Sequence, residues 1–296
     1  MRIGIDLGGT KIEAVLLDER GRVRLRRRTA TPRGDYAATL AAVAGLVARA
    51  ETAAGRKGLS VGLGHPGALS GKTGLIKNAN STCLIGRPLD RDLARLLKRP
   101  VRLANDADCF ALSEAVDGAG AGAGLVFGVI LGTGVGGGLV SRGKLLSGPN
   151  RIAGEWGHNP LPSPRDDERP GPECYCGRRA CVEAFLSGPA LEAQYASLAG
   201  RAKTARQIGA AGERGEAVAR RALEVYEERL ARALAVVVNI VDPDVIVLGG
   251  GLSNIARLYK NVPRLWGRCV FSDEVRTRLV RAKHGDSSGV RGAAWL

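Results

Sequence analysis

The sequence predicts an α/β protein built from two lobes of similar topology. Predicted strands alternate with predicted helices along the 296 residues, a pattern typical of α/β domains. A strand, a glycine-rich turn and a β-hairpin occur at the start of the chain and again from Leu125. A repeat on this scale indicates duplicated lobes rather than a solenoid. The length also suits two ordinary domains.

The composition excludes a disordered chain. Hydrophobic residues make up 45% and charged residues 25%, close to the values of soluble globular proteins. The net charge of +15 comes mostly from arginine and fits either a polyanion partner or a bias spread over solvated faces. Residues 24–28 lie in a predicted edge strand, and no dense basic stretch is interleaved with aromatic residues. We therefore expect no nucleic-acid partner.

The sequence predicts neither an N-terminal signal peptide nor a membrane span. Asp6 interrupts the start of the chain before a signal-peptide core could form. The longest apolar run, residues 124–140, contains many glycines and is too short to cross a bilayer. These observations predict a cytoplasmic protein without a membrane partner.

The first lobe is predicted to begin with a strand at residues 4–6 and a glycine turn at 7–11. A second strand at residues 12–17 and a third that ends at Arg28 complete a hairpin. A helix is predicted over residues 35–54, because leucine and valine recur there at helical spacing behind a possible N-cap, Asp35. The strand at residues 59–64 follows.

The second lobe repeats this order and adds a long helix. We expect strands at residues 125–131 and 245–248, glycine turns at 132–138 and 249–251, and a helix at 217–241. The Ala/Gly stretch at residues 118–124 is a possible hinge. The predicted lobes are residues 1–118, with a C-terminal helix at 286–296 that returns to them, and residues 119–285.

Glycine turns after buried strands are typical of triphosphate sites, because backbone N–H groups can point inward without side chains in the way. A purely steric role is the alternative, and the set of turns weighs against it. The sequence contains no Walker A motif, and the first turn precedes a strand rather than the helix of a dinucleotide fold. We therefore predict a triphosphate site. The residues concerned are Gly8, Gly9, Thr10, Lys11, Gly132, Thr133, Gly134, Gly136, Gly249, Gly250 and Gly251.

Two aspartates follow predicted strands. Asp6 faces the first glycine turn, where a carboxylate would repel phosphate unless Mg²⁺ lay between them; capping of the turn is the alternative. Asp106 begins a predicted helix and could be a helix cap. It could also be the base that phosphoryl transfer to an alcohol requires.

A polar set between the second and third glycine turns suits a polyol. Glu155 and His158 lie three positions apart beside glycines, and Glu183 follows a cysteine cluster. Carboxylates of this kind bind vicinal hydroxyls, although either glutamate alone could be a surface charge. The remaining histidines, His65 and His284, are interpreted as structural.

His158, Cys174, Cys176 and Cys181 form the Cys₃His set of closed tetrahedral zinc sites, with free buried thiols as the alternative. All four ligands come from the protein, so the metal would be structural. We expect metal loss to unfold the segment between Glu155 and Glu183, to abolish sugar binding and to spare nucleotide binding at the glycine turns.

The chain resembles the ROK family of bacterial sugar kinases over essentially its whole length. The resemblance rests on residues 3–11, IGIDLGGTK, and on the cysteine motif at 174–181, CYCGRRAC, with Glu183. It implies the duplicated, ribonuclease H-like fold of the hexokinase–actin group. It implies Asp106 as catalytic base, phosphate binding by the first two glycine turns and adenosine binding by the third. The sugar residues that it implies are Gly67, Asn80, Asn105, Asp106, Glu155, His158 and Glu183.

Several segments resemble the bacterial fructokinases, also called mannokinases, so fructose is the predicted hexose. These segments are residues 77–82, 114–118, 153–162 and 283–295. An N-acetylglucosamine or glucose kinase of the same family is the alternative. A sugar-sensing repressor would need a helix-turn-helix before the first strand. His65 departs from the aliphatic residue usual in this family's turn. We expect a homodimer that binds only ATP and a small sugar.

Overall fold

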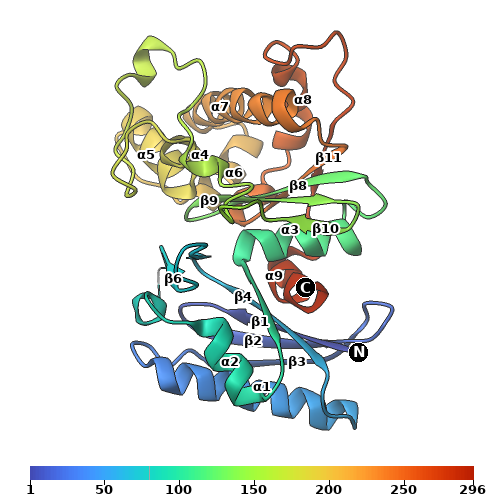
Figure 1. The fold of residues 1–296 in the computed structure, drawn as a ribbon. Coiled ribbons are helices and arrows are strands. Elements are labelled where there is room, and N and C mark those ends of the chain that lie inside the picture. Colours follow the sequence, from blue (N-terminus) through green and yellow to red (C-terminus); the bar gives the residue numbers. More distant parts are fainter. Residues whose placement is uncertain (80) are drawn as a thin grey trace. The chain divides into compact units, whose positions relative to one another are not determined.

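The computed structural model describes residues 1–79 and 81–296. Two five-stranded sheets, each accompanied by helices, account for most of it (Figure 1). The strands are β1 (Arg2–Leu7), β2 (Lys11–Leu17), β3 (Val23–Ala30), β4 (Ser60–His65), β5 (Ala68–Leu69), β6 (Ile76–Lys77), β7 (Val101–Asn105), β8 (Leu125–Leu131), β9 (Val135–Ser141), β10 (Lys144–Leu146), β11 (Val245–Gly249) and β12 (Arg278–Arg281). The helices are α1 (Tyr36–Ala54), α2 (Leu89–Leu97), α3 (Asp106–Val116), α4 (Val182–Leu186), α5 (Gly188–Ala199), α6 (Ala205–Glu213), α7 (Ala217–Val241), α8 (Leu258–Trp266) and α9 (Ser288–Trp295).

The two large sheets share one topology, which confirms the predicted duplication. The first has the order β3-β2-β1-β4-β7, and the second has the order β10-β9-β8-β11-β12. In the first, β1 to β3 pair antiparallel, while β1, β4 and β7 are parallel. In the second, β9 and β10 pair antiparallel, while β8, β11 and β12 are parallel. Parallel strands bring their carboxyl ends to one edge of a sheet, where glycine turns can collect.

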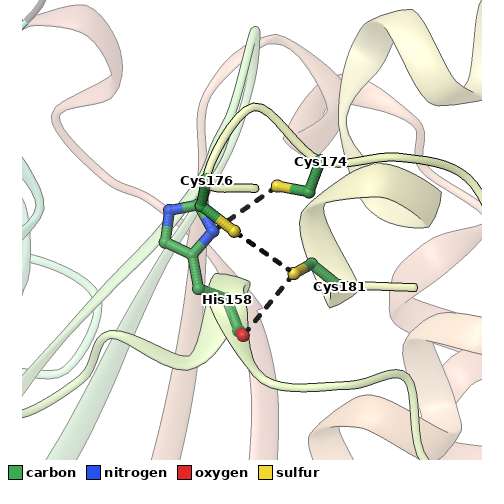
Figure 2. A group of neighbouring side chains, drawn as sticks. All are labelled: His158, Cys174, Cys176 and Cys181. Atoms are coloured by element: carbon green, nitrogen blue, oxygen red, sulfur yellow. Dashed lines mark hydrogen bonds between the residues drawn. The ribbon is translucent and has the colours of Figure 1, made fainter. Parts of the chain in front are cut away.

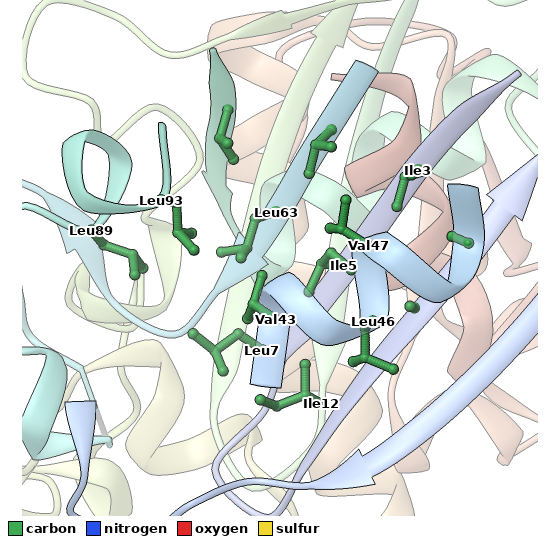
Figure 3. Close-up of a cluster of buried hydrophobic side chains, with 14 of the residues drawn as sticks. Ile3, Ile5, Leu7, Ile12, Val43, Leu46, Val47, Leu63, Leu89 and Leu93 are labelled. Carbon is green, nitrogen blue, oxygen red and sulfur yellow. The ribbon is translucent and has the colours of Figure 1, made fainter. Parts of the chain in front are cut away.

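Helix α1 forms the core of the first sheet, as its leucine and valine spacing predicts. Asp35 caps it by accepting the N–H of Ala38 at 2.9 Å. The buried face of α1 packs on alternate residues of β1 (Figure 3). Side chains that meet there include Ile3, Ile5, Leu7, Ile12, Val43, Leu46, Val47 and Leu63. By length and composition alone α1 could also span a membrane, but this buried face identifies it as a core helix.

Helix α9 covers the opposite face of the same sheet. Val15 and Leu17, which alternate with the residues that face α1, pack against Val290 and Ala294. The approach is close: a Cβ atom on Gly4 would lie 2.1 Å from the carbonyl oxygen of Val290. Glycine in β1 therefore allows the last helix of the chain to lie directly on the first strand.

Strand β3 lies at the edge of its sheet, as predicted for the arginine-rich segment. Arg26 and Arg28 both donate to Glu13 on β2, with a distance of 2.5 Å between Arg28 Nε and the carboxylate. Glu13 is only 2% exposed. These two arginines thus neutralise a buried carboxylate, while charged side chains on an edge strand also discourage pairing with another chain.

The chain divides into two compact units. The first contains residues 1–122, 138–153 and 283–296, and the second contains residues 123–137 and 154–282. Helix α9 belongs to the first unit, whereas residues 138–153 group with the first unit instead of the second lobe to which we assigned them. The predicted lobe boundary near residue 118 stays a prediction.

Candidate functional site

The first glycine turn joins β1 to β2. Its ends are closed by the Gly8 N–H, which donates to the carbonyl oxygen of Lys11 at 3.0 Å, and by the Thr31 hydroxyl, which donates to the Gly8 carbonyl at 2.6 Å. Among residues 1–79 and 81–296, no group accepts the N–H of Gly9 or Thr10. Both residues are exposed. The turn therefore offers two free backbone donors, as a phosphate site requires.

Two carboxylates with raised pKa values accompany this turn. Asp6 is cross-strand neighbour to Glu13, and burial, assisted by the charges of Asp106 and Glu13, raises the pKa of Asp6 to about 6. Burial likewise raises the pKa of Asp106, against a hydrogen bond from the N–H of Ala107 at 2.9 Å. A carboxylate with a raised pKa can accept a proton near neutral pH.

The cap of helix α3 is Asn105 rather than Asp106. The Asn105 side chain accepts the N–H of Asp108 at 2.7 Å, and Asp106 is the first helical residue. The capping alternative for Asp106 is thereby answered, because its neighbour performs that function. Asn105 and Asp106 were predicted together, and the β7–α3 junction places them side by side.

His65 is the residue whose position sequence reasoning undervalued. It ends β4, lies opposite Asn105 in the parallel register and is 2% exposed. Burial lowers the pKa of His65, and the His65 ring in turn helps to lower that of Asp106. The sequence around His65 does not predict that it lies near Asn105 and Asp106. The pairing of β4 with β7 brings these residues together.

Gly67 forms the turn after β4 with a positive φ of 78°. A Cβ atom there would lie 2.4 Å from the carbonyl oxygen of Lys77, so only glycine fits against β6. Asn80, the other predicted sugar residue of this segment, lies outside the described residues.

The second glycine turn (residues 132–138) connects β8 to β9. Its Gly132 N–H donates to the Gly134 carbonyl at 3.0 Å, and the N–H of Val135 donates to Glu183 Oε2 at 2.8 Å. In the part of the chain that is described, the N–H groups of Thr133 and Gly134 have no acceptor. This turn thus matches the first, with two adjacent free donors.

The third glycine turn (residues 249–251) lies against the end of β8. Gly250 has a φ of 78°, and a Cβ atom on it would lie 2.4 Å from the carbonyl oxygen of Leu131. The Ser253 hydroxyl donates to the Gly250 carbonyl at 2.7 Å. Within the second unit, the second and third glycine turns therefore follow neighbouring parallel strands.

The four predicted metal ligands come together (Figure 2). One donor atom from each of His158, Cys174, Cys176 and Cys181 lies within 4.8 Å of all the others. The Cys176 and Cys181 sulfurs are 3.7 Å apart, and the Cys174 sulfur is 3.7 Å from His158 Nδ1. A tetrahedral zinc with Zn–S bonds of about 2.3 Å places its ligands about 3.8 Å apart. The donor set and spacing therefore fit zinc.

In this histidine–cysteine cluster, the surroundings shift the pKa values of two thiols in opposite directions. The backbone N–H of Arg178 lowers the pKa of Cys176 to about 6, whereas burial raises the pKa of Cys181 to about 12. The other ring nitrogen of His158, Nε2, lies 3.1 Å from the hydroxyl of Tyr175, a residue that is 82% exposed. An exposed partner of this kind could be exchanged for another hydroxyl.

Glu183 lies in the first turn of α4, is 9% exposed and joins the cluster to the second glycine turn. Its Oε1 is 3.9 Å from the Cys174 sulfur, while its Oε2 accepts from Val135. Glu155 precedes the short helix Trp156–His158. Of the predicted site residues, the first unit holds Asp6, Gly8, Gly9, Thr10, Lys11, Gly67, Asn105 and Asp106, and the second holds the other described ones.

A family model described as the ROK family matches residues 2–296. An N-acetyl-D-glucosamine kinase from Vibrio cholerae is 42% identical over 300 residues, which cover 100% of this chain and 99% of that protein. A ROK hexokinase from Thermus thermophilus has a TM-score of 0.87 and 34% identity, over 99% of this chain and 96% of that one. A ROK glucokinase from Streptomyces griseus, solved with glucose and AMPPNP, has a TM-score of 0.77 and 29% identity, over 99% and 97%.

Proposed function

We propose, from the premise that this chain belongs to the ROK family, that it transfers the γ-phosphoryl group of ATP to the 6-hydroxyl of a free hexose. The observation that carries this proposal is the combination of two carboxylates with raised pKa values, Asp6 and Asp106, and a glycine turn in which the N–H groups of Gly9 and Thr10 have no acceptor among the described residues. Phosphoryl transfer needs these two functions, a base for the alcohol and donors for the phosphates.

The hexose that we propose is N-acetyl-D-glucosamine. The Vibrio cholerae relative carries that name at 42% identity over the whole chain, whereas none of the three relatives above is named for fructose. The alternative from the sequence analysis, an N-acetylglucosamine kinase, is therefore better supported than the fructokinase predicted first. Fructose and glucose remain the competing acceptors for the assay, because a few side chains decide such preferences.

In this proposal Asp106 accepts the proton of the attacking hydroxyl, since its raised pKa favours proton uptake. Asn105 directly precedes Asp106, Gly67 forms the turn after β4, and both would bind the sugar together with Asn80. Mg²⁺, when bound, would offset the negative charge of the phosphates, and Asp6 is the residue that would hold it through water. Burial raises the pKa of Asp6 together with the charges of Asp106 and Glu13, and the charge of Lys11 acts in the opposite direction.

The glycine turns would bind the nucleotide. The free N–H groups of Gly9, Thr10, Thr133 and Gly134 are donors for phosphate oxygens, and Lys11 adds a positive charge at the start of β2. Gly132 and Gly136 shape the second turn. Residues 249–251 would border the adenosine, and a Cβ atom on Gly251 would meet no other atom within 4 Å among the described residues, which leaves room for a ring.

Zinc in the histidine–cysteine cluster would be structural, with His158 binding it through Nδ1. This orientation leaves Nε2 of His158 for a sugar hydroxyl in place of Tyr175. Glu155 and Glu183 would accept hydrogen bonds from further sugar hydroxyls. We also expect a cytoplasmic homodimer, as the sequence reading did.

A substrate panel with coupled detection of ADP tests this proposal. N-acetyl-D-glucosamine, glucose, mannose and fructose are each offered with ATP and Mg²⁺, and kcat/KM is measured for each. We expect N-acetyl-D-glucosamine to have the highest value. A tenfold higher kcat/KM for fructose would contradict N-acetyl-D-glucosamine as the proposed acceptor. If no sugar led to release of ADP, the proposed kinase activity would be wrong.

A further inference from the structure

Three hydrogen bonds hold the second glycine turn, and all come from the segments that carry the histidine–cysteine cluster. Trp156 Nε1 donates to the Gly136 carbonyl at 3.1 Å, and Glu183 Oε2 accepts the N–H of Val135 at 2.8 Å. The N–H of Gly188 donates to the Gly132 carbonyl at 2.7 Å. The turn is thus hydrogen-bonded to these segments at Gly132, Val135 and Gly136.

These two segments are also bound to each other beside the cluster. The N–H of Leu161 donates to the Ala180 carbonyl, and the N–H of Val182 donates to the Asn159 carbonyl, both at 2.8 Å. His158 lies on one segment and the three cysteines lie on the other. A metal ion in the cluster would add a further connection between the two segments that contact the turn.

Glu183 is the most direct of these links. Its carboxylate fits against the turn because residue 134 is glycine: a Cβ atom there would lie 2.6 Å from Oε2. Val135 is 5% exposed, so its N–H would lose its hydrogen bond without gaining water if the carboxylate were removed. The free donors at Thr133 and Gly134 directly precede this N–H.

We propose that Glu183 is a positioning residue for the second glycine turn, and that the histidine–cysteine cluster thereby controls nucleotide affinity as well as the sugar site. The inference rests on the proposed kinase function. It assigns a second task to Glu183, because one oxygen holds the turn while the other remains for a sugar hydroxyl. It also predicts that the nucleotide site is incomplete without the metal.

The experiment compares Glu183→Ala with Glu183→Gln, which keeps an oxygen that can accept the Val135 N–H. Glu173→Gln is the matched control, since Glu173 directly precedes the ligand Cys174 and its exposed carboxylate pairs with Arg179. Trp156→Phe removes the bond to Gly136 while keeping a ring against Phe127. AMPPNP affinity is measured by calorimetry without sugar, with bound zinc by plasma mass spectrometry on the same samples.

We expect AMPPNP to bind about 10-fold more weakly to Glu183→Ala, and to a lesser extent to Trp156→Phe, at unchanged zinc content. Glu183→Gln and Glu173→Gln should bind as the wild type does. Amide exchange over residues 132–138 should accelerate in Glu183→Ala and after removal of zinc by a chelator. If Glu183→Ala retains zinc, turn protection and wild-type AMPPNP affinity, the positioning role is wrong. If Glu183→Ala does not fold, Trp156→Phe and the chelated wild type decide through the same two readouts.

The wild-type protein tests the proposed function. If it binds no AMPPNP and releases no ADP, the proposed function is wrong and the inference that rests on it fails as well. Normal catalysis by the wild type together with normal nucleotide binding by the zinc-free protein would refute only the control by the cluster.

Discussion

The negative charge of Asp106 helps to raise the pKa of Asp6, so these two carboxylates of the first unit interact electrostatically. Burial is the larger cause, and together they bring the pKa of Asp6 to about 6. A carboxylate with a raised pKa lowers the stability of the folded state at neutral pH, and such groups are found most often at functional sites.

Asp6→Asn should therefore stabilise the protein at neutral pH while abolishing kinase activity. Folded protein keeps the Asp6 proton up to about pH 6, whereas the unfolded chain loses it near its ordinary value of 3.8. Wild-type stability consequently falls as pH rises through this window, by up to about 3 kcal/mol. Urea denaturation without nucleotide or Mg²⁺ should show no gain for the variant at pH 4 and the full gain at pH 7.5. A gain that does not change with pH would contradict this account.

Asp106→Asn should lower kcat by on the order of 10²–10⁴, because the amide keeps size and polarity but cannot accept the hydroxyl proton. Sugar affinity measured by calorimetry should change far less. Asp35→Asn is a control in the same unit, since asparagine also caps helices. A variant at position 106 that keeps half of its kcat would exclude Asp106 as the base.

Cys176→Ala should lower bound zinc, measured by plasma mass spectrometry, and weaken both sugar and nucleotide binding. The sequence led us to expect that nucleotide binding would survive metal loss. The structure changes this expectation, because Trp156, Glu183 and Gly188 join the cluster-bearing segments to the second glycine turn. Calorimetric titrations with AMPPNP and sugar check it, with Cys269→Ala as the control at an exposed thiol outside the cluster. Full sugar affinity in a zinc-free protein would refute the structural metal.

Glu168→Ala should destabilise the protein by about 3–5 kcal/mol, because Glu168 is 2% exposed and pairs with Arg229 and Arg232 of α7 at 2.8 and 2.7 Å. Although burial alone would raise the pKa of Glu168, hydrogen bonds from the two arginines lower it to about 2. This contribution to stability is present above the ordinary value of 4.5 and is lost as pH falls toward 2. Denaturation at pH 7 and pH 3 should show a smaller effect of the substitution at the lower pH; an equal effect would contradict the ionic origin.

Sequence alone determined the α/β class, the duplicated strand–turn–hairpin order and the bounds of the long helices. These features depend on local patterns: alternating apolar residues for strands, helical spacing at residues 35–54, and glycine after each buried strand. The cysteine motif predicted its cluster for the same reason, since ligands close in sequence need little help from the fold to meet. Asp106 was predicted as a candidate catalytic base because it follows a predicted strand and begins a predicted helix.

Tertiary structure decided what each of these groups touches. His65 reaches the neighbourhood of Asp106 only because β4 pairs with β7, and Glu183 reaches Val135 only because α4 packs on the turn after β8. Glu168 gave no sequence signal, yet two arginines of a distant helix donate hydrogen bonds to it. Contacts between segments far apart in the chain depend on how the strands pair and on which groups become buried. Burial raises the pKa values of carboxylates and increases the contribution of a single hydrogen bond to stability. No local sequence pattern encodes these effects.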